Sequence, residues 1–180
     1  SGDQLYQMDF QAMLQQHKDS GAAISVATIP VHAKEASDFG ILKADENNMI
    51  TAFTEKPKQN LLPDWVSDTG DEMEKQGRKY LASMGIYIFN RKVIFDQLMD
   101  EHKDAKDWGK EILPQSIGVH KIMSYQYTGY WTDIGNIYSF FEPNLALTEE
   151  IPPFNLFDNS RSIYTRARML PPAKISGTTL

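Results

Sequence analysis

The sequence contains no cysteine, and this absence excludes three kinds of chemistry at once. Without thiols there is no disulfide, no thiolate metal site and no cysteine nucleophile. A cysteine-free chain suits a reducing compartment, so we expect a cytoplasmic protein. No apolar run comes close to the roughly 18 residues that a membrane helix requires. The first residues, 1–6, also lack the basic region and apolar core of a signal peptide, and we expect no membrane partner.

Positive charge is sparse and dispersed. The 18 Lys and Arg residues are outnumbered by 24 Asp and Glu residues, which gives a net charge of −6. No basic stripe is present, so we expect no nucleic-acid partner. The sequence has no GxGxxG or P-loop motif and no serine nucleophile elbow. The four histidines show no metal-ligand spacing and are expected to be structural or exposed: His17, His32, His102 and His120.

The patterns that are present predict an α/β fold built from alternating helices and strands. Asp9 is a helix N-cap candidate and Gly21 a stop signal. The apolar run 22–29 then predicts a buried strand that ends before Pro30. Residues 84–89 and 120–127 predict further strands. Helices are expected after Asn90, from Gly109, and from Gly135 or Asn136. The first of these, capped by Asn90, would place Val93, Ile94, Leu98 and Met99 on one side.

Two segments predict the outer parts of the fold. The runs 39–44 and 49–55 flank four turn-forming residues, which predicts a hairpin. Residues 58–79 are polar and irregular and predict a long surface loop with one helical turn. After Glu150 the pairs Pro152–Pro153 and Pro171–Pro172 interrupt any periodicity. We therefore expect one domain over 1–150 and a linker over 151–180, whose last residues, 175–180, start a new β unit.

Five places combine charged or hydroxyl side chains with turns or strand ends. A carboxylate directly after glycine, as at Asp3, can approach a metal closely, but it is also a common turn residue. The pair Glu55–Lys56 can bind hydroxyls and phosphate, or can be a solvated strand end. Asp133 precedes a predicted helix and fits either a metal ligand or an N-cap. Asp107 fits a binding residue or the start of a surface helix.

The fifth place is a pair of hydroxyl side chains on one strand. Ser83 and Tyr87 lie four residues apart, so they point to the same face of a strand. Met84, Ile86 and Ile88 would fill the opposite face. The hydroxyl face is either a binding surface or a sheet face that a helix covers, and the spacing leaves both alternatives open.

Taken in order, these segments resemble the ADP-glucose pyrophosphorylase family (glucose-1-phosphate adenylyltransferases) over almost the whole chain. Each motif is modest alone, and their shared order makes the resemblance specific. The segments that carry it are SGDQLY (1–6), FTEKPK (53–58), LASMGIYIF (81–89), DWGKEILP (107–114), YWTDIG (130–135), IYT (163–165) and LPPAK (170–174).

The resemblance implies a nucleotide-diphospho-sugar transferase fold, with a Rossmann-like mixed sheet between helices and a left-handed β-helix at its C-terminal side. It implies that ATP and glucose 1-phosphate react to ADP-glucose and pyrophosphate for glycogen or starch synthesis. Asp3 and Asp133 match the family's catalytic, Mg²⁺-binding aspartates, and Lys56 matches the lysine that binds the sugar phosphate. The positions that match glucose contacts are Glu55, Ser83 and Tyr87, with Asp107 and Trp131 in the same wall.

The chain also departs from the family pattern. The printed sequence does not contain the family's Gly-rich triphosphate loop with its arginine, or the catalytic lysine of the first half. We therefore expect a fragment, the second half of the catalytic domain with at most the start of the β-helix, without turnover on its own. The family also implies a homo-oligomer. Two alternatives remain: a sibling enzyme with another nucleotide or sugar phosphate, and a non-catalytic regulatory subunit of the same fold.

Overall fold

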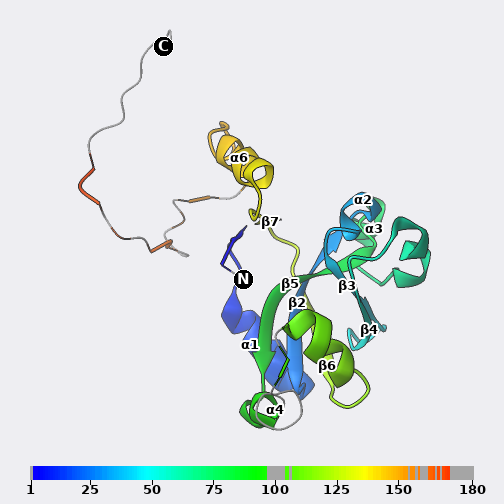
Figure 1. Cartoon of the computed structure of the whole chain (residues 1–180). Coiled ribbons are helices and arrows are strands. Elements are labelled where there is room, and N and C mark those ends of the chain that lie inside the picture. The colour runs from blue at the N-terminus through cyan, green and yellow to red at the C-terminus, as the bar shows by residue number, and fades with distance from the viewer. Residues whose placement is uncertain are drawn as a thin grey trace.

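The computed structural model describes residues 2–96, 104–105, 107–153, 155–156, 158, 162–164, 166 and 168–170. Its five-stranded mixed sheet has the order β4-β3-β5-β2-β6, and β1 and β7 form a separate two-stranded ribbon (Figure 1). The elements are β1 (Gln4–Tyr6), α1 (Phe10–Ser20), β2 (Ile24–Val31), α2 (Ala33–Ala36), β3 (Gly40–Ala44), β4 (Ile50–Glu55), η1 (Gln59–Trp65), α3 (Asp71–Lys75), β5 (Tyr80–Phe89), α4 (Arg91–Asp96), η3 (Trp108–Ile112), α5 (Leu113–Ser116), β6 (Ile122–Gln126), β7 (Trp131–Asp133) and α6 (Ile137–Ala146). The predicted α/β fold class is confirmed.

Strand β2 is an inner strand of the sheet, between β5 and β6, and is buried along its whole length. It pairs antiparallel with β5 and parallel with β6. The strand continues through Pro30, where the sequence predicted its end. Strand β6 pairs with β2 only as far as Thr28, so one side of β2 is an open edge beyond that residue. A proline has no N–H to donate, and none is needed on an open edge, so proline is tolerated there.

Two apolar cores lie on the two faces of this sheet. On one face, Met13 of α1 packs with Ala27 and Ile29 of β2. On the other face, Leu113 of α5 packs with Ile24 and Val26. The alternation of successive β2 residues between the two cores is the period-2 pattern of a strand covered on both sides. The sheet therefore separates two surfaces, and each of them carries part of the candidate site described below.

The first predicted helix is confirmed together with its caps. The Asp9 carboxylate accepts hydrogen bonds from the Gln11 and Ala12 amides, and Gly21 ends the helix in the left-handed conformation with φ 62°. His17 is buried and structural, as expected, with Nδ1 2.8 Å from the Ser25 hydroxyl. Its Nε2 lies 3.2 Å from the Asn90 side chain, which also donates to the Ala22 carbonyl. Asn90 therefore fastens α1 to the end of β5.

The predicted hairpin is present as β3 and β4, and the segment after it is more ordered than the sequence suggested. Residues 58–79 contain two helical elements, η1 and α3, where one turn was expected. Leu62 is buried in the core, and the Ser67 hydroxyl accepts a hydrogen bond from the Ala44 amide. These contacts fasten the segment to the hairpin, which explains why it is not an open surface loop.

Helix α6 follows the β1–β7 ribbon and stands apart from the five-stranded sheet (Figure 1). Its apolar residues are exposed, among them Ile137 at 91% and Tyr138 at 73%. Among the described residues after Glu150 there is no helix or strand, and the boundary at residue 150 stays a prediction. The predicted β unit at 175–180 and two residues of the predicted helical face, Leu98 and Met99, lie outside the described residues.

In the described part of the chain, no helix combines the length and the apolar character that crossing a membrane requires.

Candidate functional site

The structure brings Asp3 and Asp133 together, although they lie far apart in the sequence. Strand β1 pairs antiparallel with β7, with Gln4 opposite Asp133, and the Ile134 amide donates to the Asp3 carbonyl at 2.9 Å. A Cβ atom placed on Gly135 would lie 3.0 Å from Asp133 Oδ1 and 3.2 Å from Asp3 Oδ2. Both carboxylates therefore converge on one small space, which is kept open by the glycine between them.

Asp133 is not the cap of α6. That helix is capped by Asn136, whose side-chain oxygen accepts from the Ser139 amide at 2.9 Å. Asp133 Oδ1 instead accepts from the Gly135 amide at 2.9 Å, which fixes the carboxylate in the turn before the helix. The N-cap alternative for Asp133 is therefore wrong.

The chemistry of this carboxylate pair fits Mg²⁺. Carboxylate oxygens are the ligands that this hard cation prefers, and Mg²⁺ commonly uses only one or two of them beside water and phosphate oxygens. Among the described residues, no group of three or more His, Cys, Asp or Glu side chains could hold a metal ion. A cation at Asp3 and Asp133 would therefore take its remaining ligands from water and from a phosphorylated substrate.

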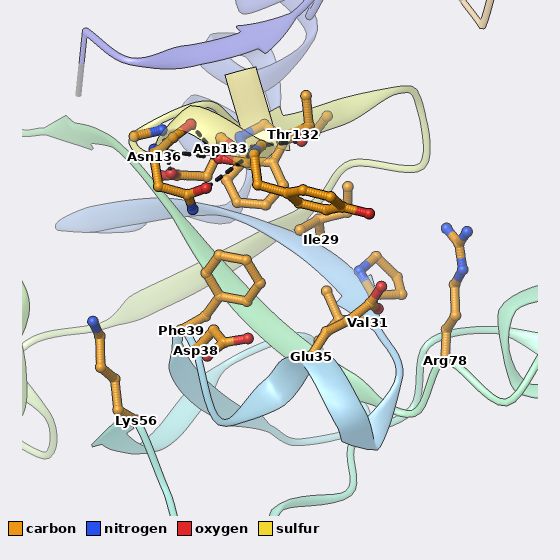
Figure 2. A pocket seen from close by; sticks show the side chains of 15 residues that line it. Ile29, Val31, Glu35, Asp38, Phe39, Lys56, Arg78, Thr132, Asp133 and Asn136 are labelled. Atoms are coloured by element: carbon orange, nitrogen blue, oxygen red, sulfur yellow. Dashed lines mark hydrogen bonds between the residues drawn. The ribbon is translucent and has the colours of Figure 1, made fainter. Parts of the chain in front are cut away.

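A cleft of about 780 Å³ lies beside this pair, and it contains Lys56, Trp131 and Asp133 in its lining (Figure 2). Lys56 has a positive φ of 47°, and its amide donates to the Phe39 carbonyl at 3.0 Å. The Phe39 ring meets the Trp131 ring edge to face, with centroids 5.3 Å apart. Phe39 thus connects the turn that carries Lys56 with the strand that carries Asp133.

The predicted sugar-contacting residues form a second group around Tyr87. Burial raises the pKa of the Tyr87 hydroxyl above its usual value, a hydrogen bond with Ser83 lowers it, and the nearby charges of Asp107 and Glu55 raise it further. Ser83, Asp107 and Glu55 therefore all lie near the Tyr87 hydroxyl, although the four residues come from β4, β5 and the segment before η3. At neutral pH the tyrosine is protonated and can donate a hydrogen bond.

The π-helical turn η3 closes this group. Asp107 accepts a hydrogen bond from the Lys110 amide at 2.9 Å, so it does cap a helical turn, as one alternative held. Lys110 Nζ lies 3.9 Å from Glu55 Oε1. A Cβ on Gly109 would lie 3.4 Å from Asp107 Oδ1 and 3.9 Å from the Tyr87 hydroxyl. Asp107 therefore caps the turn and also lies beside the Tyr87 group. π-helical turns often occur at functional sites.

The residues of the cleft and the residues of the Tyr87 group pack against different cores. Trp131 packs against the core that α1 covers, whereas Tyr87 packs against the core that α5 covers. The peptide Glu55–Lys56 joins them, because Glu55 reaches the Tyr87 group and Lys56 lines the cleft. The structure thus gathers the predicted residues into two half-sites connected at the end of β4.

Three residues near the half-sites were not identified in the sequence: Phe39, Gly40 and Arg78. Gly40 begins β3 and lies opposite Glu55. A Cβ atom at Gly40 would lie 2.7 Å from the Phe53 ring and 3.0 Å from Glu55 Oε2. The glycine thus leaves the space that the Glu55 carboxylate occupies. A glycine at a strand start next to a candidate motif is a detectable signal of close approach.

We expect Gly40→Ala to weaken binding of glucose 1-phosphate, the ligand that the resemblance implies, by roughly tenfold. The added methyl must displace the Phe53 ring and the Glu55 carboxylate, and overpacking of this kind costs about 1–3 kcal/mol. Calorimetric titration measures the affinity, and a thermal unfolding curve shows whether the fold is intact. The double variant Gly40→Ala/Phe53→Leu provides the control, since the smaller side chain should restore part of the affinity. Unchanged binding in the single variant would contradict the assigned role of Glu55.

Comparison with known families agrees with the fold. The family described as nucleotidyl transferase matches residues 1–150, a range that contains both carboxylates of the pair, the cleft lysine and the whole Tyr87 group. The match covers most of the 180 residues. The chain belongs to the nucleotidyl transferase family.

Proposed function

We propose that this chain contributes the sugar-phosphate and metal-binding part of a glucose-1-phosphate adenylyltransferase. The enzyme would transfer AMP from ATP to glucose 1-phosphate and release ADP-glucose and pyrophosphate. Family membership supports nucleotidyl transfer in general. The convergence of Asp3 and Asp133 at Gly135 carries the proposal, because two carboxylates beside a cleft with a lysine are the groups that a metal-dependent phosphate transfer requires.

The roles proposed for the residues are those that the resemblance implies, and the charge and position of each residue support them. A bound Mg²⁺ would neutralise phosphate charge and orient the triphosphate for in-line attack. Asp3 and Asp133 would hold that ion. Lys56 would hold the phosphate of glucose 1-phosphate as a point charge. Catalysis then consists mainly of positioning and charge neutralisation, since the attacking oxygen already belongs to a phosphate and needs no strong base.

The Tyr87 group would bind the hexose. Glu55 and Asp107 offer carboxylate oxygens to sugar hydroxyls, while Ser83 and Tyr87 offer hydroxyls that donate or accept. The proposal also places Trp131 at the wall next to the lysine. Because the two half-sites meet at Glu55–Lys56, a sugar 1-phosphate bound there would have its hexose on one side of this peptide and its phosphate on the other.

The wider proposal concerns the setting of the enzyme. We propose a cytoplasmic homo-oligomer that acts in glycogen or starch synthesis, which rests on the ordered motifs and on the cysteine-free composition. The exposed apolar face of α6 is in keeping with a chain that packs against other protein surface.

Substrate profiling of the protein that carries this chain tests the proposal. We expect ATP with glucose 1-phosphate to give the highest kcat/KM among pairs of nucleoside triphosphates and hexose 1-phosphates, in the presence of Mg²⁺. Preference for another nucleotide or hexose phosphate would replace the adenylyltransferase with a sibling enzyme. Absence of turnover with every pair, in a folded protein that still binds glucose 1-phosphate, would point to the regulatory subunit.

A further inference from the structure

A second cation lines the cleft at a distance from the candidate phosphate lysine. Arg78, two residues before β5 begins at Tyr80, contributes to the lining together with Lys56. Figure 2 shows the two side chains on opposite sides of the cleft, with Phe39, Asp38 and Glu35 between them in this view. Because the cations stand apart, one small anion at Lys56 leaves the Arg78 guanidinium available for another group.

The backbone of Arg78 is held firmly in place. Its amide donates to the Met73 carbonyl at 2.9 Å, and its carbonyl accepts from the hydroxyl of Thr69, a buried residue, at 2.7 Å. The preceding Gly77 turns with φ 78°, and a Cβ there would lie 3.6 Å from the His32 ring at the start of α2. A cation presented from such an anchored segment loses less entropy on binding than one on a free loop.

The charges of the cleft indicate the kind of anion. Its lining has three carboxylates, Glu35, Asp38 and Asp133, beside its two cations. The Glu35 carboxylate accepts a hydrogen bond from the His32 amide at 3.1 Å, so it is engaged with α2. Because the lining has more negative than positive side chains, a highly charged phosphate binds better when a divalent cation accompanies it. Asp133 belongs to the carboxylate pair that could bind such a cation.

We propose that Arg78 is a further substrate-binding residue, which holds the pyrophosphate end of the nucleotide and of the released product. The inference rests on the proposed function, because it assumes that Lys56 takes the sugar phosphate. Arginine suits this role, since its planar guanidinium donates two parallel hydrogen bonds to phosphate oxygens, whereas lysine acts as a point charge. The cleft is thereby divided, with the sugar phosphate at Lys56 and the pyrophosphate group at Arg78.

Calorimetric titration of the chain with Mg²⁺-pyrophosphate, and separately with glucose 1-phosphate, tests the division. We expect Arg78→Gln to weaken pyrophosphate binding about tenfold or more, which is the effect of losing one charge-assisted contact, and to leave glucose 1-phosphate binding unchanged. Arg78→Lys should restore part of the loss. Lys79→Gln is the matched control, because it removes one positive charge from the neighbouring residue, which is not part of the lining.

The outcomes separate this inference from the proposed function. Equal weakening of both ligands in Arg78→Gln would assign Arg78 to the sugar phosphate and overturn the division, as would unchanged pyrophosphate binding or a wild-type chain that binds no pyrophosphate. Lys56→Ala reports on the proposed function in the same titrations. If that variant binds glucose 1-phosphate as tightly as the wild type does, the proposed function fails whatever Arg78 does.

Discussion

We expect Asp133→Asn to lower kcat for the proposed ADP-glucose formation by roughly two orders of magnitude or more in the protein that carries this chain. The asparagine oxygen can still accept the hydrogen bond from the Gly135 amide, so the turn before α6 should persist. What is lost is one of the two negative charges that converge on the proposed metal position. Metal ions contribute several kcal/mol of charge stabilisation in the transition state, and each 1.4 kcal/mol corresponds to about tenfold in rate.

Steady-state kinetics at several Mg²⁺ concentrations distinguish a metal ligand from a structural aspartate. The Mg²⁺ concentration for half-maximal rate should rise in the variant, and excess Mg²⁺ should recover part of the activity. Asp64→Asn is the matched control, because this aspartate lies exposed on η1 and the Lys43 ammonium bonds to its backbone carbonyl, which the substitution leaves in place. A variant at Asp133 with the wild-type rate and the wild-type Mg²⁺ dependence would remove the metal site from the proposal.

The local patterns predicted most of the elements because their signals lie within a few residues. Asp9 and Gly21 mark the ends of α1 in their own side-chain chemistry and backbone conformation. The hairpin is encoded by its turn, where the Asp45 carboxylate accepts from the Asn47 and Met49 amides. Such features need no knowledge of the rest of the chain, so they are visible in the sequence.

The errors arose where distant contacts decide the structure. Pro30 is accepted within β2 because β6 stops pairing at Thr28, which the sequence around Pro30 does not reveal. Residues 58–79 look like a loop until Leu62 is seen in the core. In each case a tertiary contact overrides a local preference.

Some features of the candidate site could be predicted from the local sequence, and others depend on distant contacts. The same-face placement of Ser83 and Tyr87 follows from strand geometry and agrees with their hydrogen bond, even though β5 bulges between them and Gly85 has a φ of 68°. Met84 is buried in the opposite core, as the alternation predicted. The meeting of Asp3 with Asp133 depends on pairing between strands that lie far apart in the sequence. Spacing could not predict it, and only the resemblance linked the two residues.

Lys56 offers a sharper test. Loss of its side chain should weaken binding, whereas replacement by glycine rather than alanine should raise the free energy of unfolding. We expect Lys56→Ala to raise the KM for glucose 1-phosphate by roughly ten- to a hundredfold with a small effect on kcat, since a hydrogen bond to a charged group contributes about 1.5–3 kcal/mol. Lys58→Ala, which removes an exposed lysine two residues away, should leave KM unchanged. A normal KM in Lys56→Ala would remove this residue from the sugar-phosphate site.

The backbone at Lys56 makes the comparison with glycine informative. Its φ of 47° lies in the left-handed region, where a side chain costs roughly 1 kcal/mol relative to glycine. Lys56→Gly should therefore lose the same affinity as Lys56→Ala while unfolding at a higher denaturant concentration than the alanine variant. A lysine kept in a conformation that favours glycine is explained by a contact outside the folded chain itself, and the charge facing the cleft supplies one. Equal stability of the two variants would show that the turn is unstrained and would leave affinity alone to support the role of Lys56.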